Sequence, residues 1–305
     1  MGKYWSPVKK LSSWRKISVG MWAPPDDPTI YGYETLIVDK ALQYIKEVEE
    51  ASGVKLTMTS FIVLVMAQAM AQDPVLNVMV VNGRIQKRNT LDAFCQVMIP
   101  GDGQADLSGV QIRSVDELNL VEINEALKGR AKKVRAGEDQ GLERQKKMID
   151  RVPPWLIRKM VQLVDFLTFN VPIDLDGLGV RSDPFGSFMV SSVASFDIRL
   201  GFAPLVPASR TPLVALPGAI FDRPMVVDGE IKACKVMQMG CTFDHRCYDG
   251  YQIGVIVRFI RGSVENPYEY FPHPSTFAKA KAGRVDDSSD DMEPALEREE
   301  APAEA

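Results

Sequence analysis

The chain carries Phe243-Asp244-His245-Arg246-Cys247-Tyr248-Asp249-Gly250 near the end of its apolar part. The 305 residues contain only two histidines, and one of them stands in this octet. Five fixed positions of the form D-H-R-x-x-D-G arise by chance in about 10⁻⁴ of random chains of this length. The octet therefore offers the most specific starting point for the fold and the chemistry.

His245 is the residue of the octet best suited to move a proton. The unperturbed pKa of histidine lies nearest to neutral pH, which makes it the usual proton carrier in catalysis. Asp249 stands four positions later, where a carboxylate can fix the surroundings of a general base. The alternative is a structural histidine at a sheet edge, but the flanking charges and Gly250 favour catalysis. His273 lies between two prolines without such neighbours, and we expect it in a solvated loop.

The composition limits the class of protein. Hydrophobic residues make up 46% of the chain, enough for the full core of one large domain or two small ones. The cysteines lack C-x-x-C spacing, which argues against a metal site and against a disulfide framework. No secretory segment and no apolar run of about eighteen residues is present, so we expect the reducing cytoplasm. The four free thiols expected are Cys95, Cys234, Cys241 and Cys247.

The net charge of −4 hides an asymmetry along the chain. From Asp286 onward there are nine acidic residues against Arg298 alone, a net −8 that leaves the first 285 residues at +4. This end of the chain is rich in Ala, Pro, Ser and Glu without apolar periodicity, so residues 276–305 are predicted to be a disordered acidic tail. The mildly basic remainder suits an anionic ligand.

The first half of the chain predicts helices and strands in mixed order. Thr29–Val38 is β-branched and aromatic, as in a strand. Asp39 is expected to cap a helix that runs to about Ser52 and ends at Gly53. Thr59–Gln72 is apolar on nearly every side, which predicts a buried helix. The other elements expected here are strands around Asn77–Val81, Ala93–Ile99 and Gly109–Ser114, and a helix over residues 115–135.

The second half is richer in predicted strands. A final helix is expected from about Asp249 to Val264, with Ile253, Val257 and Ile260 on one face. Mixed order without a long βαβ repeat predicts an α+β layered fold, and we assign residues 1–275 to a single domain. The β segments expected before that helix are Phe188–Phe196, Leu213–Ala219, Arg223–Val227 and Val236–Phe243.

The octet resembles the active-site signature of the acyltransferase component of 2-oxo acid dehydrogenase complexes. Its H-x-x-x-D-G spacing is shared with chloramphenicol acetyltransferase. The resemblance covers about residues 12–137 and 186–270 and implies an α+β coenzyme A-dependent acyltransferase fold, a mixed-sheet sandwich with flanking helices. Further stretches similar to family motifs are Ser12-Ser13-Trp14-Arg15-Lys16-Ile17, Gly186-Ser187-Phe188-Met189-Val190-Ser191-Ser192, Gly201-Phe202-Ala203-Pro204-Leu205, Pro224-Met225-Val226-Val227-Asp228-Gly229-Glu230-Ile231 and Glu265-Asn266-Pro267.

The resemblance implies direct acyl transfer between coenzyme A and a thiol, hydroxyl or amine acceptor. His245 would take the proton of the attacking group as a general base. Ser191 would donate a hydrogen bond to the oxyanion of the tetrahedral adduct, and no covalent acyl-enzyme is implied. Asp249 would pair with Arg15 and tie the N-terminal segment to the site. Its alternative role is a helix N-cap, and both roles are compatible.

The family also implies a homotrimer with each active site between two subunits, so that His245 would work beside Ser191 of a neighbour. Coenzyme A is the expected cofactor, no metal is expected, and no nucleic-acid partner is expected. We expect a stand-alone form without the lipoyl and peripheral-subunit-binding domains of a dehydrogenase component. Asp39-Lys40-Ala41 mimics a lipoylation motif only by coincidence, so we expect no lipoyl attachment. Cys247 replaces a small aliphatic residue of the family and is expected to be a packing neighbour rather than a nucleophile.

Residues 138–185 form an insert where the family has a short loop. It contains a charged helical stretch followed by the apolar stretch Trp155–Phe169. The plainer interpretation is a helix packed on the trimer surface or over the substrate channel. The alternatives are a lid for a long apolar acyl chain, or an interfacial helix that contacts lipid through residues 153–169. Arg158, Lys159 and Asp165 argue against a simple membrane span.

Three hypotheses follow from these residues. The first is a stand-alone acyltransferase of the reaction described above. The second is a non-catalytic trimeric scaffold or lipid-binding module that keeps the fold, although such a protein has no need of His245 and Ser191. The third is a dehydrogenase core whose lipoyl domain is supplied by another chain, and the charged C-terminal extension makes cage assembly doubtful for it.

Overall fold

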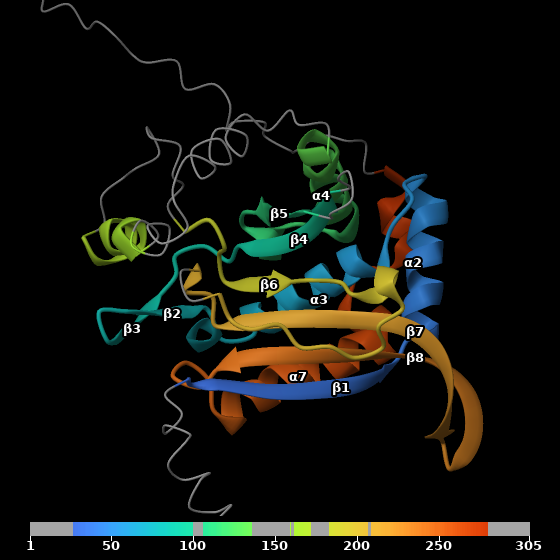
Figure 1. Cartoon of the computed structure of the whole chain (residues 1–305). Coiled ribbons are helices and arrows are strands. Elements are labelled where there is room, and N and C mark those ends of the chain that lie inside the picture. The colour runs from blue at the N-terminus through green and yellow to red at the C-terminus, as the bar shows by residue number, and fades with distance from the viewer. Residues whose placement is uncertain are drawn as a thin grey trace, which may run out of the picture.

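A computed structural model of the chain describes residues 27–99, 106–135, 159, 162–171, 183–206 and 209–279. Its centre is a six-stranded mixed sheet with the strand order β1-β8-β7-β6-β4-β5. Helices α2, α3, α4 and α7 gather on one side of this sheet (Figure 1). The expected α+β mixed sheet with flanking helices is confirmed. Arg15, residues 138–158 of the insert and the tail from residue 280 lie outside the described residues.

The N-terminal elements follow the local sequence signals closely. Strand β1 (Thr29–Ile37) leads into helix α2 (Asp39–Ser52), which ends at Gly53 with a left-handed φ of 71°. The cap prediction for Asp39 is wrong, because Val38 is the N-cap residue and makes no side-chain cap. The Asp39 carboxylate instead accepts a hydrogen bond of 3.0 Å from the Lys235 backbone N–H. A contact 196 residues away has taken the place of a local one.

Helix α3 (Met58–Ala71) is the buried helix that its all-round apolar sequence predicts. Ten of its fourteen residues are buried, and it packs against α7 and α4. Thr57 caps its start by accepting a hydrogen bond from the Ser60 backbone N–H at 3.1 Å. The Ser60 hydroxyl in turn donates to Asn124 of α4 at 2.9 Å, so a polar pair is satisfied inside the core.

A short hairpin stands apart from the main sheet. Strands β2 (Val78–Val81) and β3 (Arg84–Lys87) pair only with each other and are joined by Asn82-Gly83. Positive φ angles of 51° and 69° at these two residues are those of a type I′ turn. Sequence reasoning found β2 but missed β3, although an Asn-Gly pair between strand-like stretches is a strong hairpin signal.

Strands β4 (Ala93–Ile99), β5 (Asp106–Ile112) and β6 (Phe188–Val190) complete one side of the sheet.

Two expectations about the elements next to these strands are corrected. The helix expected over residues 115–135 is a 3₁₀ turn (Val115–Glu117) followed by α4 (Leu120–Arg135), because the Asn119 side chain accepts from the Val121 and Glu122 N–H groups and starts the helix there. The strand expected over Phe188–Phe196 ends at Val190, and Ala194–Phe196 form a 3₁₀ turn.

The longest pair of strands is β7 (Leu213–Val227) with β8 (Glu230–Asp244). Three separate β segments were expected in this region, but two of them belong to the single strand β7, with a bulge between Pro217 and Ile220. Their hairpin extends beyond the rest of the sheet (Figure 1). Helix α7 (Gly250–Glu265) follows β8 after a five-residue connection, and α8 (Pro267–Tyr270) and a 3₁₀ segment (Pro274–Lys279) close the described C-terminal region.

The part of the chain that the structure describes contains no helix long and apolar enough to cross a membrane. Among those same residues no cluster of histidine, cysteine, aspartate and glutamate side chains is arranged to hold a metal ion. The described cysteines are free, and Cys95, Cys234 and Cys241 are buried.

The loop that follows β6 lies directly on the sheet because two glycines of β7 and β8, Gly218 and Gly240, leave room for it. The Ala219 N–H donates to the Ile198 carbonyl at 2.8 Å, and the Val193 N–H donates to the Pro217 carbonyl at 3.1 Å. A Cβ atom added at Gly240 would collide with the Gly201 carbonyl oxygen of this loop. At Gly32 of β1 an added Cβ would meet only the Phe243 ring, at 4.0 Å.

We therefore expect Gly240→Ala to lower the free energy of unfolding by about 1–3 kcal/mol, the usual cost of overpacking. Gly32→Ala is the matched control and should stay within about 0.5 kcal/mol of the wild type. Urea denaturation followed by far-UV circular dichroism measures both changes. Equal stabilities of the two variants would contradict the close approach of the loop to β8.

Candidate active site

The octet forms the connection between the end of β8 and the start of α7. The Cys247 and Tyr248 backbone N–H groups both donate to the Asp244 carbonyl, at 2.9 and 3.0 Å. The His245 N–H donates to the Pro28 carbonyl at 2.8 Å, which joins the connection to the segment before β1. The backbone around the histidine is therefore fixed by hydrogen bonds at both ends.

The His245 ring is held in one orientation by its own loop. Its Nδ1 atom lies 2.8 Å from the Tyr248 carbonyl oxygen. A carbonyl oxygen only accepts hydrogen bonds, so Nδ1 must carry the proton in this contact. In the neutral ring the lone pair is then on Nε2, and the His245 side chain is exposed. The geometry supplies what a general base needs, a fixed tautomer with an accessible basic nitrogen.

The two charges that flank His245 pair with each other. Asp244 is 6% exposed, and its carboxylate receives the Arg246 guanidinium at distances of 2.6, 2.9 and 3.2 Å. The same carboxylate accepts the Arg246 backbone N–H at 2.9 Å. Hydrogen bonding to Asp244 raises the pKa of Arg246. The pair closes the turn around the histidine, so these charges have a structural task in the loop.

Asp249 caps helix α7. Its carboxylate accepts a hydrogen bond from the Tyr251 N–H at 2.8 Å, and the Gln252 side chain accepts the Asp249 N–H at 3.1 Å. This reciprocal arrangement is a capping box, and it satisfies two helix N–H groups that would otherwise lack partners. Of the two roles that the sequence suggested for Asp249, the structure shows the helix cap. The pairing with Arg15 lies outside the described residues and stays a prediction.

Tyr248 and Cys247 attach the loop to the body of the protein. The Tyr248 ring is buried against Phe243, and its hydroxyl donates to the Leu76 carbonyl at 2.6 Å. Cys247 is half-buried, and burial, with the nearby Asp244 charge, raises the pKa of its thiol to about 11. The thiol is therefore protonated at neutral pH, which fits the expected packing role and argues against a nucleophile.

Ser191 lies at a distance from His245 within one chain. It follows β6, and its N–H donates to the Ala215 carbonyl of β7 at 3.0 Å. Ala215 pairs with Cys241 of β8, and His245 comes four residues after Cys241, just past the end of that strand. Four residues span roughly 13 Å along the sheet, and the two intervening strand spacings add about 10 Å across it. A single subunit does not bring these two side chains together.

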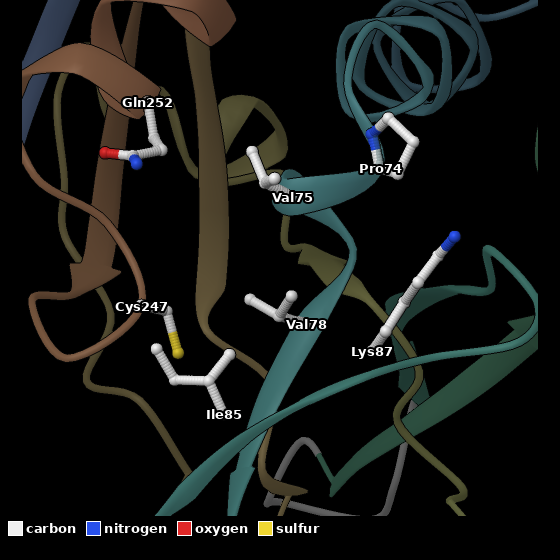
Figure 2. A pocket seen from close by; sticks show the side chains of 7 residues that line it. All are labelled: Pro74, Val75, Val78, Ile85, Lys87, Cys247 and Gln252. Carbon is white, nitrogen blue, oxygen red and sulfur yellow. The ribbon is translucent and has the colours of Figure 1, made fainter.

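A shallow hollow of about 430 Å³ opens beside the histidine loop. Figure 2 shows Cys247 and Gln252 on one side of it, with Val78, Ile85 and Lys87 of the β2–β3 hairpin on the other. Pro74 and Val75 complete the lining. Sequence reasoning missed this hollow, because its walls come from segments more than 150 residues apart. The Asn82-Gly83 turn could have located one of its walls.

Comparison with known proteins agrees with this geometry. The model of the family described as 2-oxoacid dehydrogenases acyltransferase (catalytic domain) matches residues 15–146 and 184–271. The unmatched residues 147–183 lie within the expected insert. The match includes Ser191, His245 and Asp249, and it begins at Arg15.

Curated relatives and solved structures point to the same family. The probable succinyltransferase component of the 2-oxoglutarate dehydrogenase complex of Schizosaccharomyces pombe is 24% identical over 74% of the chain and 41% of its own length. The corresponding Escherichia coli protein is 24% identical over 76% of the chain and 46% of its own length. The chain therefore spans less than half the length of these relatives.

Among solved structures, a probable dihydrolipoamide acetyltransferase from Listeria monocytogenes superposes with a TM-score of 0.59 at 17% identity, over 88% of the chain and 98% of its own. The cubic core of a pyruvate dehydrogenase multienzyme complex also gives a TM-score of 0.59, at 13% identity, over 87% and 94%. These likenesses show a shared fold.

The helix cap yields a prediction for Asp249. Asp249→Ala should lower the free energy of unfolding by about 1 kcal/mol, because it removes an N-cap, whereas Asp249→Asn should keep most of it. Thermal unfolding of the two variants measures this difference. If Asp249→Asn is as unstable as Asp249→Ala, the negative charge and not the cap is what the structure needs.

The raised pKa of the Cys247 thiol yields a second prediction. Only the thiolate reacts with iodoacetamide, so the alkylation rate of Cys247 should keep rising with pH toward about 11. An unperturbed thiol would reach its plateau above about pH 9. Mass spectrometry of Cys247 peptides after timed alkylation between pH 7 and 10 checks this. A rate that levels off by about pH 10 would show that the thiol is not buried as described.

Proposed function

Because the chain belongs to the 2-oxoacid dehydrogenase acyltransferase (catalytic domain) family, we propose that it transfers an acyl group between coenzyme A and a thiol, hydroxyl or amine acceptor. The observation that carries the proposal is the His245 ring, whose Nδ1–H is held by the Tyr248 carbonyl at 2.8 Å so that Nε2 is free. A histidine in this state can accept a proton on Nε2 and return it, as a general base and acid does.

The reaction proceeds by direct transfer. Nε2 of His245 takes the proton of the acceptor group, for example a thiol, as that group attacks the carbonyl carbon of the acyl thioester. The tetrahedral adduct carries its negative charge on oxygen, where a hydroxyl donor such as Ser191 stabilises it. Collapse of the adduct breaks the bond to the coenzyme A sulfur, and His245 returns the proton to that sulfur. No bond to the enzyme forms at any step.

The register of the sheet supports a site shared between two subunits. Ser191 of one chain lies roughly 13 Å along the sheet and about 10 Å across it from His245 of the same chain. An oxyanion donor has to lie about 3 Å from the reacting oxygen. The serine that serves a given His245 therefore comes from a neighbouring subunit in this proposal, and the homotrimer implied by the family resemblance would contain three such sites.

A related enzyme supports the choice of residues. A serine, a histidine and an asparagine were studied for their roles in the catalytic mechanism of the dihydrolipoamide acetyltransferase of Azotobacter vinelandii. The histidine and the asparagine stand four positions apart there, the same spacing as His245 and Asp249. In this proposal Asp249 acts through the helix cap that positions the loop, and its pairing with Arg15 adds to that role.

Other features of the site are part of the proposal. The relatives are named for transfer to dihydrolipoyl groups, so dihydrolipoamide is the first acceptor to test, together with coenzyme A as the acyl donor. The cytoplasm remains the expected location. Contact of residues 153–169 with lipid also remains a prediction. Leu163 and Phe166, which are 57% and 50% exposed, are the described side chains available for it.

Two other functions remain to be separated from this one by experiment. A non-catalytic scaffold or lipid-binding module would keep the fold without using the free Nε2 atom. A dehydrogenase core served by a lipoyl domain of another chain would use the same chemistry in a larger assembly. Binding of acyl-coenzyme A by calorimetry and the size of the particle by electron microscopy distinguish these cases.

We expect His245→Ala to reduce the release of coenzyme A from acyl-coenzyme A in the presence of dihydrolipoamide by about 10²–10⁴-fold, because the general base is lost. Ser191→Ala should cost about 10²–10³-fold through the loss of an oxyanion donor. His273→Ala, which removes a histidine of the exposed loop after α8, is the matched control and should leave the rate unchanged. A full rate in His245→Ala would refute the proposal.

Mixed oligomers test whether the site is shared. We expect co-expressed His245→Ala and Ser191→Ala chains to regain about a quarter of the wild-type activity, because random mixing pairs an intact His245 with an intact Ser191 at that fraction of heterologous interfaces. Each variant alone stays inactive and serves as the control. If mixing restores nothing although differently tagged chains co-purify, each subunit uses its own serine.

A further inference from the structure

The free edge of strand β2 is held by two arginine side chains. Pairing with β3 uses one edge of β2, so the carbonyls of Val78 and Val80 point to the other edge. The Val78 carbonyl accepts a hydrogen bond from Arg88 Nη1 at 3.2 Å, and the Val80 carbonyl accepts one from Arg210 Nη1 at 2.9 Å. The two arginines therefore take the place that a further strand would occupy.

Each of these arginines is paired with an aspartate of the insert. Arg210 binds Asp165 with two hydrogen bonds of 3.0 and 2.5 Å. Arg88 binds Asp183 with two hydrogen bonds of 2.7 and 3.0 Å. The Arg210 and Asp165 side chains are 21% and 20% exposed. The Arg88 side chain is 3% exposed, and that of Asp183 is 29% exposed. Bidentate pairs of this kind fix direction as well as position, so the insert is attached to the hairpin at two points.

A third contact joins the insert to the tip of the hairpin. The Asn170 side-chain amide donates to the side-chain oxygen of Asn82, which stands in the β2–β3 turn. The helical segment of the insert around Phe166–Asn170 lies beside this hairpin (Figure 1). An isolated two-stranded hairpin is at best marginally stable in water. The contacts with the insert therefore give the β2–β3 hairpin much of its fixed position.

The hairpin thus held is one wall of the hollow beside the histidine loop. Val78 and Ile85 face Cys247 across it (Figure 2). Ile85 and Val75 are 58% and 51% exposed, although both border a hollow lined mainly by apolar groups. The Lys87 ammonium group is directed away from Cys247 in Figure 2, and Lys87 is the one charged residue among the seven that line the hollow. Exposed apolar side chains around a concave surface are typical of a binding site.

We propose that this hollow receives the apolar acyl chain of the acyl-coenzyme A substrate, and that the insert determines chain-length selectivity by fixing the hairpin wall. The inference rests on the proposed acyl transfer. Its occupant follows from position and chemistry. Cys247, which lines the hollow, belongs to the same loop as His245 and lies two residues from it, and the volume of about 430 Å³ is within the size range of ligand pockets. The substrate class is an acyl group longer than acetyl, with an uncharged end.

Arg88, Arg210, Asp165 and Asp183 are positioning residues in this proposal. They contact neither the acyl chain nor the reacting atoms, and they act through the backbone of β2. Their loss should therefore change how well long acyl chains bind, with little effect on the chemical step for acetyl groups.

The first experiment measures kcat/KM of the full chain for acetyl-, butyryl-, hexanoyl- and octanoyl-coenzyme A with dihydrolipoamide as the acceptor. We expect an increase of about threefold per methylene added, the effect of burying a methylene in a half-open apolar site. Ile85→Ala should lower the hexanoyl-to-acetyl ratio of kcat/KM about fivefold. Ile231→Ala, at the exposed tip of the β7–β8 hairpin, is the matched control. A ratio unaffected by Ile85→Ala would overturn the subsite.

The second experiment tests the attachment of the insert. Arg210→Met and Asp165→Asn should raise KM for hexanoyl-coenzyme A about five- to tenfold and leave kcat for acetyl-coenzyme A unchanged. Arg261→Met, which breaks the Arg261–Glu34 pair of 2.9 Å between α7 and β1, is the matched control for a lost ion pair. Equal losses for acetyl and hexanoyl substrates would show a general structural role and would overturn the selectivity role of the insert.

A binding measurement separates this inference from the proposed reaction. Calorimetry on His245→Ala protein compares coenzyme A with hexanoyl-coenzyme A. At about threefold for each of four methylenes, we expect the acyl form to bind about 80-fold more tightly, and Ile85→Ala should reduce this difference about fivefold. If that difference is found but the wild type transfers no acyl group, the subsite stands and the proposed reaction falls. If transfer occurs without any dependence on chain length, the reaction stands, and the hollow serves the coenzyme arm, a neighbouring subunit or solvent.

Discussion

The antiparallel pairing of β7 with β8 is the interaction on which the site depends. Its register sets Leu213 opposite Phe243 at one end of the sheet, so β8 ends at Asp244, and His245 leaves the sheet beside Pro28. The same ladder fixes the level at which Ser191 leaves β6, through the hydrogen bond to Ala215. Because strand registers shift only in whole residues and each slip turns side chains to the opposite face, the positions of histidine and serine are set by backbone pairing and not by the loops. That pairing separates the two side chains within one subunit.

The polar groups around His245 have their partners inside the loop itself. The Asp244 carboxylate pairs with Arg246, the Asp249 carboxylate accepts a helix N–H, and the Nδ1 atom of His245 contacts the Tyr248 carbonyl. Each of these bonds removes freedom from the segment that carries the ring, and none of them involves the Nε2 atom. Preorganisation of this kind lowers the cost of reaching the reactive geometry, since the ring need not be reoriented when the substrate arrives. The octet thus holds the basic Nε2 atom of His245 in a fixed position.

The sequence predicted the elements whose signals are local. Strand β1, helix α2 with its Gly53 end and helix α7 were found almost to the residue, because β-branched runs, a left-handed glycine and a 3.6-residue periodicity are readable within a short window. Asp39 was misjudged because its partner, Lys235, lies 196 residues away. The bonds of Arg88 to Asp183 and of Arg210 to Asp165 connect segments 95 and 45 residues apart, and no local pattern marks them. The octet itself marked His245 and offered a helix cap as one role of Asp249, and the resemblance to a known family added Ser191, but the hollow came from the structure.

In the proposed site, the insert offers a way to change selectivity without changing the chemistry. The catalytic loop is tied to β1, to α7 and to the Leu76 carbonyl, none of which belongs to the insert. The hairpin wall of the hollow, in contrast, is a two-stranded element whose free edge is bound by Arg88 and Arg210, and both arginines take their partners from the insert. A change in the insert therefore moves one wall while the histidine stays in place. Since a marginal hairpin adjusts at small energetic cost, this wall is the part of the site where a family member can adapt to a different acyl group.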